Sequence, residues 1–275
     1  MILDYSEYNT ESAEDGVVNF IINRTNLPLF THKPHCPFCD RAIDNEVHSK
    51  TSVTYPVWLN GEFRQSETVI QCPICGWWEY QYKTSSDAIL DGIRASSITF
   101  KSAILKQFNN SSIEVPVNEL RKYLLKKPDV IYGIDAHKME ELVRSVFKDF
   151  YPNCQVISMG KTRDGGKDAI LIDNQGKHFF VSVKRRSDPN KTEGVDTIRD
   201  LLGAMIAHDG ITGCIYVSTA DHFSSDALKH LEKVKASSSN IVDTFELYDF
   251  KRFIEAIHKS ASKLPDSWSQ LLKLK

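Results

Sequence analysis

The chain has 275 residues, of which 41% are hydrophobic and 25% are charged, a composition typical of a folded globular protein. Its length favours two compact units, or one unit with a large appendage. A formal net charge of -2 excludes attraction of nucleic acid by the molecule as a whole, so any such binding needs a local basic patch.

The sequence carries no pattern of a membrane or secreted protein. No apolar run approaches the length of a membrane span. The N-terminal residues MILDYSEYNTESAEDG are acidic and lack the basic and then apolar order of a signal peptide. We therefore expect no membrane association and a cytoplasmic location.

The N-terminal part of the chain predicts short strands and turns. Val17–Ile22 reads VVNFII, an apolar run that predicts a strand. Residues 32–82 are rich in aromatic and β-branched side chains, and residues 95–108 fit either a strand or a helix. Aromatic side chains crowd one short stretch and suit either base stacking or packing, of which we favour packing. They are Trp77, Trp78, Tyr80 and Tyr82.

Four of the six cysteines form two matched C-P-x-C pairs, namely Cys36, Cys39, Cys72 and Cys75. In a reducing compartment such pairs are more typical of metal ligands than of disulfides. Two C-x2-C turns supply the four thiolates of a tetrahedral structural Zn²⁺ site, and the long spacing between them suits a β-hairpin. The alternative is a redox dithiol, but that chemistry uses one CxxC within a βαβ unit. We therefore predict a zinc ribbon.

Helices and strands alternate in the rest of the chain. Residues 115–128 and 137–150 predict helices, and Asp135 is a plausible N-cap of the second. Strands are then expected at 155–158, 168–172, 179–184, 211–217 and 241–247, and helices at 195–207, 226–234 and 250–259. This order predicts an α/β fold with a mixed sheet flanked by helices.

The segment DAILIDNQGKHFFVSVK predicts a hairpin with charged ends. If Asn174–Gly176 is its turn, Asp168 falls opposite Ser182, because successive side chains of a strand alternate between faces. Asp168 and Lys184 then converge at the open end of the hairpin. Any hairpin can carry an acid and a lysine at its ends, so this spacing alone is a weak signal.

A second acid lies on the helix at 137–150. Apolar residues at helical spacing form its core-facing stripe, namely Met139, Leu142, Val143, Val146, Phe147 and Phe150. Glu140 lies at the edge of that stripe, whereas Glu141 points to solvent. Two acids and a lysine at one sheet edge suit phosphodiester hydrolysis, in which carboxylates hold Mg²⁺ and the lysine assists at the phosphate.

Several segments in order resemble the Mrr-type restriction endonucleases of the PD-(D/E)xK nuclease superfamily. They are MEELVRSVFKDF, MGKTRDGGKDAILI, FFVSVKRR, VDTIRDLLGAM and VSTADHFSSDAL, within about residues 120–234. The resemblance implies a restriction-endonuclease-like fold in which Glu140, Asp168 and Lys184 are catalytic. It also implies Mg²⁺ or Mn²⁺ as catalytic ion, double-stranded DNA as substrate, and a role in restriction or anti-phage defence. The expected zinc ribbon is similar to accessory modules of such nucleases.

Ser182 departs from the family pattern. The family usually has Gln or Glu two residues before the lysine, where its oxygen helps to position metal or water. Serine is shorter and uncharged, and reaches that place only through an intervening water. The site therefore works with the metal held mainly by Asp168 and a backbone carbonyl, or it has reduced or no activity.

Basic residues surround the predicted site. Arg185 and Arg186 continue the strand of Lys184, and Lys161 and Arg163 precede the Gly-Gly turn. We predict that these four side chains bind DNA, with a solvated loop of scattered charge as the alternative reading.

We expect three parts: a β-rich zinc-ribbon domain at 1–85, a connecting helical region at 86–132, and a nuclease domain at 133–275. The first functional hypothesis is a Mg²⁺-dependent DNA endonuclease with Ser182 as a fourth member of its site. The alternative is a zinc-ribbon DNA-binding or sensor protein with an inactive nuclease fold, and a nuclease for RNA or branched DNA comes third. A homodimer and partner subunits of a defence system are both left open.

Overall fold

The computed structural model describes residues 1–15, 35–43, 46–57, 61–86, 96–158, 168–208, 210–237 and 244–274. The chain divides into two compact units. We call Leu3–Gln107 with Pro265–Lys275 the sheet unit, and Met1–Ile2 with Phe108–Leu264 the α/β unit. The strand expected at Val17–Ile22 lies outside the described residues.

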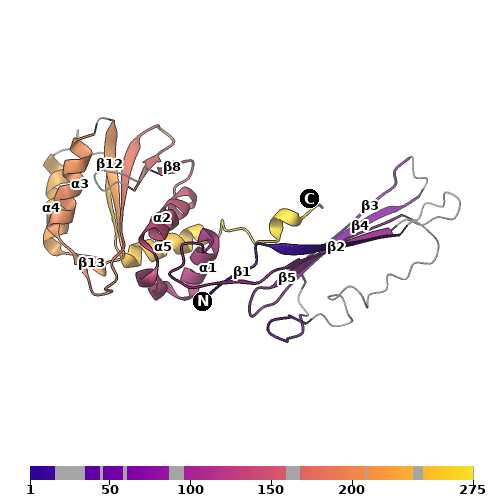
Figure 1. Ribbon diagram of the computed structural model, residues 1–275. Helices are drawn as coiled ribbons and strands as arrows, with labels where there is room; N and C mark the ends of the chain where they lie inside the picture. The colour runs from indigo at the N-terminus through magenta and orange to yellow at the C-terminus, as the bar shows by residue number, and fades with distance from the viewer. Residues whose placement is uncertain are drawn as a thin grey trace. The chain divides into compact units, whose positions relative to one another are not determined.

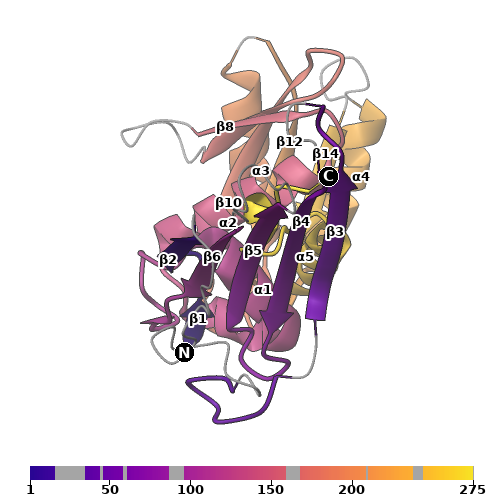
Figure 2. The ribbon, with the colours of Figure 1, turned by 90° about the vertical axis from the view of Figure 1, so that its right-hand side faces the viewer.

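The sheet unit is built on a five-stranded antiparallel sheet (Figures 1 and 2). Its strands in spatial order are β2 (Tyr8–Asp15), β6 (Ser96–Ala103), β5 (Trp78–Ser86), β4 (Phe63–Gln71) and β3 (Glu46–Thr54). The strands and turns expected for residues 32–82 are confirmed where they are described, but β3, β4 and β5 have nine residues each and are longer than the short strands expected. Residues 95–108, which fit either a strand or a helix, contain β6 and β7 (Lys106–Phe108), and β7 pairs with β1 (Ile2–Asp4).

The C-terminal segment belongs to the core of the sheet unit. Trp268 is 8% exposed and packs in one cluster with Val69 and Tyr80 of the sheet. The segment forms a single 3-10 turn, η3 (Ser269–Leu271), and the backbone nitrogen of Lys273 donates to Glu67 at 2.8 Å. Burial of the Trp268 ring explains why the last residues stay with this unit.

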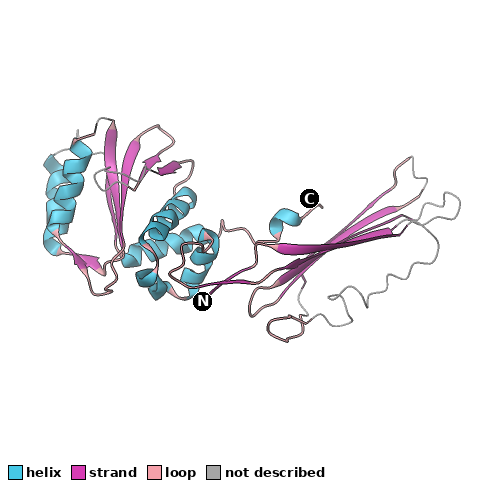
Figure 3. Ribbon diagram, in the orientation of Figure 1, coloured by secondary structure: helices cyan, strands magenta, loops and turns pink. Residues whose placement is uncertain are grey.

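The α/β unit contains a five-stranded mixed sheet (Figure 3). In spatial order the strands are β14 (Thr244–Tyr248), β12 (Ile211–Ser218), β10 (His178–Lys184), β9 (Ala169–Ile172) and β8 (Gln155–Ser158). The first three are parallel, and β9 and β8 are antiparallel to their neighbours. Gly213 allows β12 and β14 to approach, because a Cβ there would lie 2.2 Å from the carbonyl oxygen of Thr244.

Helices cover both faces of this mixed sheet. On one face, a hydrophobic cluster contains residues of α1 (Val117–Lys126), the 3-10 helix η2 (Pro128–Gly133), α2 (Ala136–Phe150) and α5 (Phe250–Ala261). On the other face, a second hydrophobic cluster contains residues of α3 (Val195–Ile206) and α4 (Ser225–Ser237). The predicted N-cap of α2 is confirmed, because the Asp135 side chain accepts from the nitrogens of His137 and Lys138. The predicted α/β class with a mixed sheet is confirmed. No helix in the described ranges is long and apolar enough to cross a membrane.

The two units have different bounds from the three expected parts. Residues 96–103, expected in a connecting helical region, form β6 in the centre of the antiparallel sheet. Helix α1, expected in the same region, packs with α2 and α5 in the α/β unit. Residues 265–275, expected with the nuclease domain, belong to the sheet unit. Contacts between residues that are distant in the sequence therefore determine where the two units begin and end.

Candidate functional site

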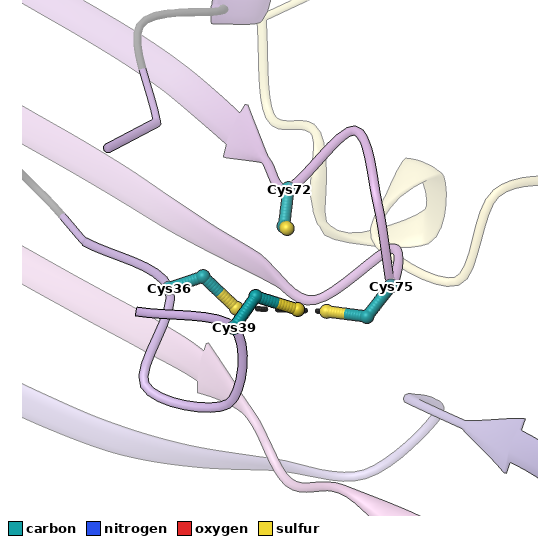
Figure 4. Close-up of side chains that lie close together, drawn as sticks. All are labelled: Cys36, Cys39, Cys72 and Cys75. Carbon is teal, nitrogen blue, oxygen red and sulfur yellow. Dashed lines mark hydrogen bonds between the residues drawn. The ribbon is translucent and has the colours of Figure 1, made fainter. Parts of the chain in front are cut away.

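Four thiols come together in the sheet unit (Figure 4). The sulfur atoms of Cys36, Cys39, Cys72 and Cys75 all lie within 4.8 Å of one another. The Sγ atoms of Cys36 and Cys75 lie 3.5 Å apart, and all four cysteines are free. The predicted convergence of the two cysteine pairs is thus confirmed.

The two cysteine loops share one backbone pattern. In each, the first cysteine donates its N–H to the carbonyl five residues later, and its own carbonyl accepts from the N–H four residues later. These bonds are Cys36 to Arg41 at 2.8 Å, Cys72 to Trp77 at 2.7 Å, Asp40 to Cys36 at 2.9 Å, and Gly76 to Cys72 at 3.0 Å. The fifth residue of each loop has a positive φ, 48° at Asp40 and 86° at Gly76, which suits Asp and Gly better than branched residues.

The thiols differ in how readily they ionise. Burial raises the pKa of Cys72, but hydrogen bonds from the backbone amides of Cys75 and Ile74 outweigh burial and lower that pKa to about 7. The pKa of Cys39 rises to about 12, first because of its hydrogen bond with Cys75 and then because of burial. Thiols this close cannot all ionise without a cation among them. Four soft sulfur donors in two turns fit a tetrahedral metal site.

The aromatic residues after the second cysteine pair are packing residues, as predicted. Trp77, Trp78 and Tyr80 are at most 2% exposed. The indole nitrogen of Trp77 donates to the carbonyl of Ala103 at 2.8 Å, and that of Trp78 donates to the carbonyl of Tyr5 at 2.9 Å. Their rings therefore complete the core beside the thiols, and these three are not available for base stacking.

The hairpin of β9 and β10 has the predicted register. His178 pairs with Ile172 and Val181 with Ala169, so the next position places Asp168 opposite Ser182. The backbone nitrogen of Asp168 donates to the carbonyl of Val181 at 3.1 Å. Its carboxylate oxygen Oδ2 accepts from the nitrogen of Val183 at 2.6 Å. The acid is thus held against the strand that carries the lysine.

Lys184 ends β10, paired with Ser218 of β12. Phe180, on the same face of β10, packs in the cluster of α3 and α4, whereas Val181 packs in the cluster of α2 and α5. Ser182 and Lys184 therefore point to the α3 side. Lys184 is exposed, and its ammonium has no hydrogen-bond or ion-pair partner in the described part of the chain. Its charge is thus available to a ligand.

The two acids of α2 lie as predicted relative to the core. The side chain of Glu140 is 27% exposed and lies 3.6 Å from Nδ1 of His137. Glu141 is 41% exposed and pairs with Lys138 at 2.6 Å. Helix α2 covers the face of the sheet opposite to the one that Lys184 faces, so the two side chains can meet only beyond the strand ends. A common site for Glu140 and Lys184 stays a prediction.

A comparison with known families gives a match within the α/β unit. Residues 131–257 match the family model of the Mrr catalytic domain, described as a restriction endonuclease. Through this segment the chain is similar to the Mrr-type restriction endonucleases. The match contains Glu140, Asp168, Ser182 and Lys184. Neither the curated proteins nor the solved structures searched contain a match to the chain.

The basic residues of the α/β unit are held to different degrees. Nη1 of Arg185 donates to the carbonyl of Tyr132 at 2.9 Å. Arg186 makes a bidentate pair with Glu193 and keeps 28% of its side chain exposed. Lys161 and Arg163 lie outside the described residues. DNA binding by these side chains stays a prediction, and the Glu193 pair gives Arg186 a structural partner as well.

Glu193 was not anticipated from the sequence. Glu193 is the second residue of the short strand β11 (Thr192–Glu193), which pairs with β13 (His222–Phe223). Only 1% of the residue is exposed. Burial raises the pKa of its carboxyl, but hydrogen bonds from Arg186 and Ser218 outweigh burial and hold that pKa below its usual range. The residue therefore stays ionised inside the domain. A lone glutamate before a glycine carries no sequence pattern that indicates burial.

Proposed function

We propose that the protein is a metal-dependent DNA endonuclease in which Glu140, Asp168 and Lys184 form the catalytic centre. The observation that carries the proposal is the pairing of Asp168 with the backbone of β10, close to an exposed Lys184 whose ammonium has no partner among the described residues. Both residues lie inside a segment that matches restriction endonucleases. Carboxylate oxygens are the donors that Mg²⁺ and Mn²⁺ prefer, so Asp168 and Glu140 fit such an ion. Bound there, the ion would neutralise charge on the scissile phosphate and activate a water molecule.

Each residue of the chain then has its own task. Asp168 presents a carboxylate whose direction is fixed by the Val183 N–H. Lys184 donates its ammonium hydrogens to the phosphate oxygens, where negative charge grows in the transition state. Ser182 replaces the usual Gln or Glu and contributes through a held water. We assign phosphate contacts of the bound DNA to Arg185, Arg186, Lys161 and Arg163.

We propose Zn²⁺ as the ion of the four-thiol cluster, with a structural role. The cluster joins the turn between β4 and β5 to the loop before β3, so one ion would tie two segments that are distant in sequence. The set contains four cysteines and no described histidine or carboxylate, as structural rather than catalytic zinc sites do. Such a cluster stays reduced in the cytoplasm, which is also where restriction or anti-phage defence meets foreign DNA.

A second candidate is a DNA-binding or sensor protein with an inactive nuclease fold, and Ser182 is the observation that favours it. One assay separates the two candidates. Supercoiled plasmid, methylated and unmethylated, is incubated with the protein and Mg²⁺ or Mn²⁺, with Asp168→Asn as the control. Cleavage by the wild type and not by the variant supports the endonuclease. Tight binding without cleavage of either plasmid supports the second candidate.

A further inference from the structure

A buried ionised carboxylate lies beside the proposed catalytic strand. The Glu193 side chain accepts four hydrogen bonds from three side chains. They come from Arg186 Nε at 2.6 Å and Nη2 at 2.8 Å, Ser218 Oγ at 2.7 Å, and Thr197 Oγ1 at 3.1 Å. Every lone-pair direction of the carboxylate is therefore used within the protein. Glu193 has no capacity left for a metal ion or substrate.

Two of the three donors to Glu193 are neighbours of Lys184 in the sequence or in the sheet. Arg186 follows Lys184 by two residues, and Ser218 is the residue that pairs with Lys184 on the neighbouring strand. Thr219, the residue that follows β12, adds another link, because its backbone nitrogen donates to the carbonyl of Lys184 at 3.2 Å. Oγ1 of Thr219 also accepts from the nitrogen of Arg186 at 2.6 Å. Glu193 thus connects Arg186, two residues past the end of β10, to Ser218, the last residue of β12.

We infer that Glu193 is a positioning residue that sets the place of the Lys184 ammonium, an inference that rests on the proposed function. The lysine side chain itself has no partner among the described residues, so only its backbone is held. The Cα position of Lys184 depends on the end of β10, which the hydrogen bonds of Arg186 and Ser218 to Glu193 hold in place. A buried ion pair is weak evidence for stability, because desolvation offsets most of its attraction. The ion pair between Glu193 and Arg186 therefore serves to fix the position of the proposed catalytic Lys184.

The variant Glu193→Gln tests this inference. Glutamine retains one carbonyl oxygen, which can replace the oxygen that accepts from Ser218 or the one that accepts from Thr197, and it gives up the charge that pairs with Arg186. We expect the single-turnover cleavage rate at saturating plasmid to fall about 10–100-fold, the range that a displacement of about 1 Å produces. The Kd for DNA, measured without divalent metal, should change by less than the cleavage rate does, because Glu193 contacts no ligand itself and acts on DNA binding only through its partner Arg186.

A matched control separates positioning from stability. Asp149→Asn removes a carboxylate from Arg121, which is 1% exposed and bonded at 2.6 Å in the same unit. This variant should lower Tm as Glu193→Gln does and leave the cleavage rate unchanged. A double-mutant cycle adds a second readout: in a Lys184→Ala background, Glu193→Gln should cost little further rate, because the two residues act as one.

The possible results distinguish the positioning role of Glu193 from the endonuclease proposal. A wild-type rate in Glu193→Gln, or an equal fold-loss with and without Lys184, overturns the positioning role and leaves the endonuclease proposal intact. A matching loss of rate in Asp149→Asn also overturns it, because general instability then explains the effect. A wild-type protein that cleaves no DNA overturns the endonuclease proposal, and the positioning role falls with it.

Discussion

The carboxylate of Asp168 accepts a hydrogen bond from the backbone amide of Val183 at 2.6 Å. Strand β9 begins one residue later, at Ala169, so β9 supplies no backbone partner for the Val183 amide. The acid completes the ladder with its side chain and is thereby held beside the residue that precedes Lys184. One hydrogen bond serves both the fold and the proposed site.

Substitution of Asp168 separates these two tasks. Asp168→Asn keeps an acceptor for the Val183 amide and removes the negative charge, so we expect a stable protein whose plasmid cleavage falls at least about 100-fold. Asp168→Ala should lose the same activity and also about 1–2 kcal/mol of unfolding free energy, because the amide is left unpaired. Urea unfolding and plasmid nicking measure the two effects. Cleavage by Asp168→Asn at the wild-type rate would remove this residue from the site.

The adjacent acids of α2 form a natural pair of variant and control. Glu140→Gln should reduce cleavage by about 100-fold or more if Glu140 shares the metal with Asp168. Glu141→Gln should leave cleavage unchanged and cost at most about 1 kcal/mol, because its pair with Lys138 is 41% exposed on the acid side. The measurement is the cleavage rate as a function of Mg²⁺ concentration. Equal effects of the two substitutions would contradict the assignment of Glu140.

Ser182 offers a gain-of-function test. Ser182→Glu places a carboxylate opposite Asp168, where the related nucleases usually have Gln or Glu. We expect the Mg²⁺ concentration for half-maximal cleavage to fall about tenfold, because one more oxygen donor faces the ion. Ser182→Ala should change that concentration little, since serine reaches the ion only through water. An unchanged metal requirement in Ser182→Glu would place this position outside the metal site.

Local patterns were sufficient for much of the α/β unit. The side-chain cap at Asp135, the apolar stripe of α2 and the turn at Asn174–Gly176 each involve residues close in sequence. Alternation of side chains along β9 and β10 then placed Asp168 opposite Ser182 without any long-range information. The two cysteine pairs were recognisable because metal-binding turns have a fixed spacing.

Features that depend on distant contacts were not predictable. Glu67 accepts from the nitrogen of Lys273, a partner 206 residues away, and no periodicity marks the return of the C-terminal segment to the antiparallel sheet. Burial of Glu193 likewise depends on Arg186 and Ser218, which approach it only in the folded domain. Sequence patterns report local geometry, whereas the partners of a buried charge are set by the topology.

The thiol cluster predicts a metal-dependent sheet unit. Cys39→Ser should abolish binding of about one Zn²⁺ per chain and lower the melting temperature of this unit, because a lost ligand opens the tetrahedral site. Cys154→Ser is the matched control, since Cys154 lies in the other unit and makes only weak bonds to backbone carbonyls. Metal analysis and calorimetry measure the outcome. A wild-type protein that folds without metal and has four reactive thiols would refute the zinc assignment.

The buried carboxyl group of Glu79 should give the protein an unusual dependence of stability on pH. The residue is 0% exposed, its Oε2 accepts only from Ser102 at 3.3 Å, and its Oε1 has no partner among the described residues. Burial raises its pKa from 4.5 to about 8. Between these values the folded state holds a proton that the unfolded state has released, so unfolding free energy falls as pH rises from 4.5 towards 8. The usual salt-bridged acid has the opposite dependence.

Two buried glutamates of the same sheet therefore respond oppositely to removal of charge. Glu79→Gln should raise the unfolding free energy at pH 8 by about 1–3 kcal/mol and have little effect near pH 4.5, because the neutral side chain resembles protonated glutamate. Glu67→Gln should lower it by about 1–3 kcal/mol at pH 8, because Glu67 is bonded to His48 at 3.0 Å and to the Lys273 amide at 2.8 Å. Denaturant unfolding at both pH values measures these differences. Destabilisation by Glu79→Gln at pH 8 would mean that the carboxylate is ionised and satisfied in the folded protein.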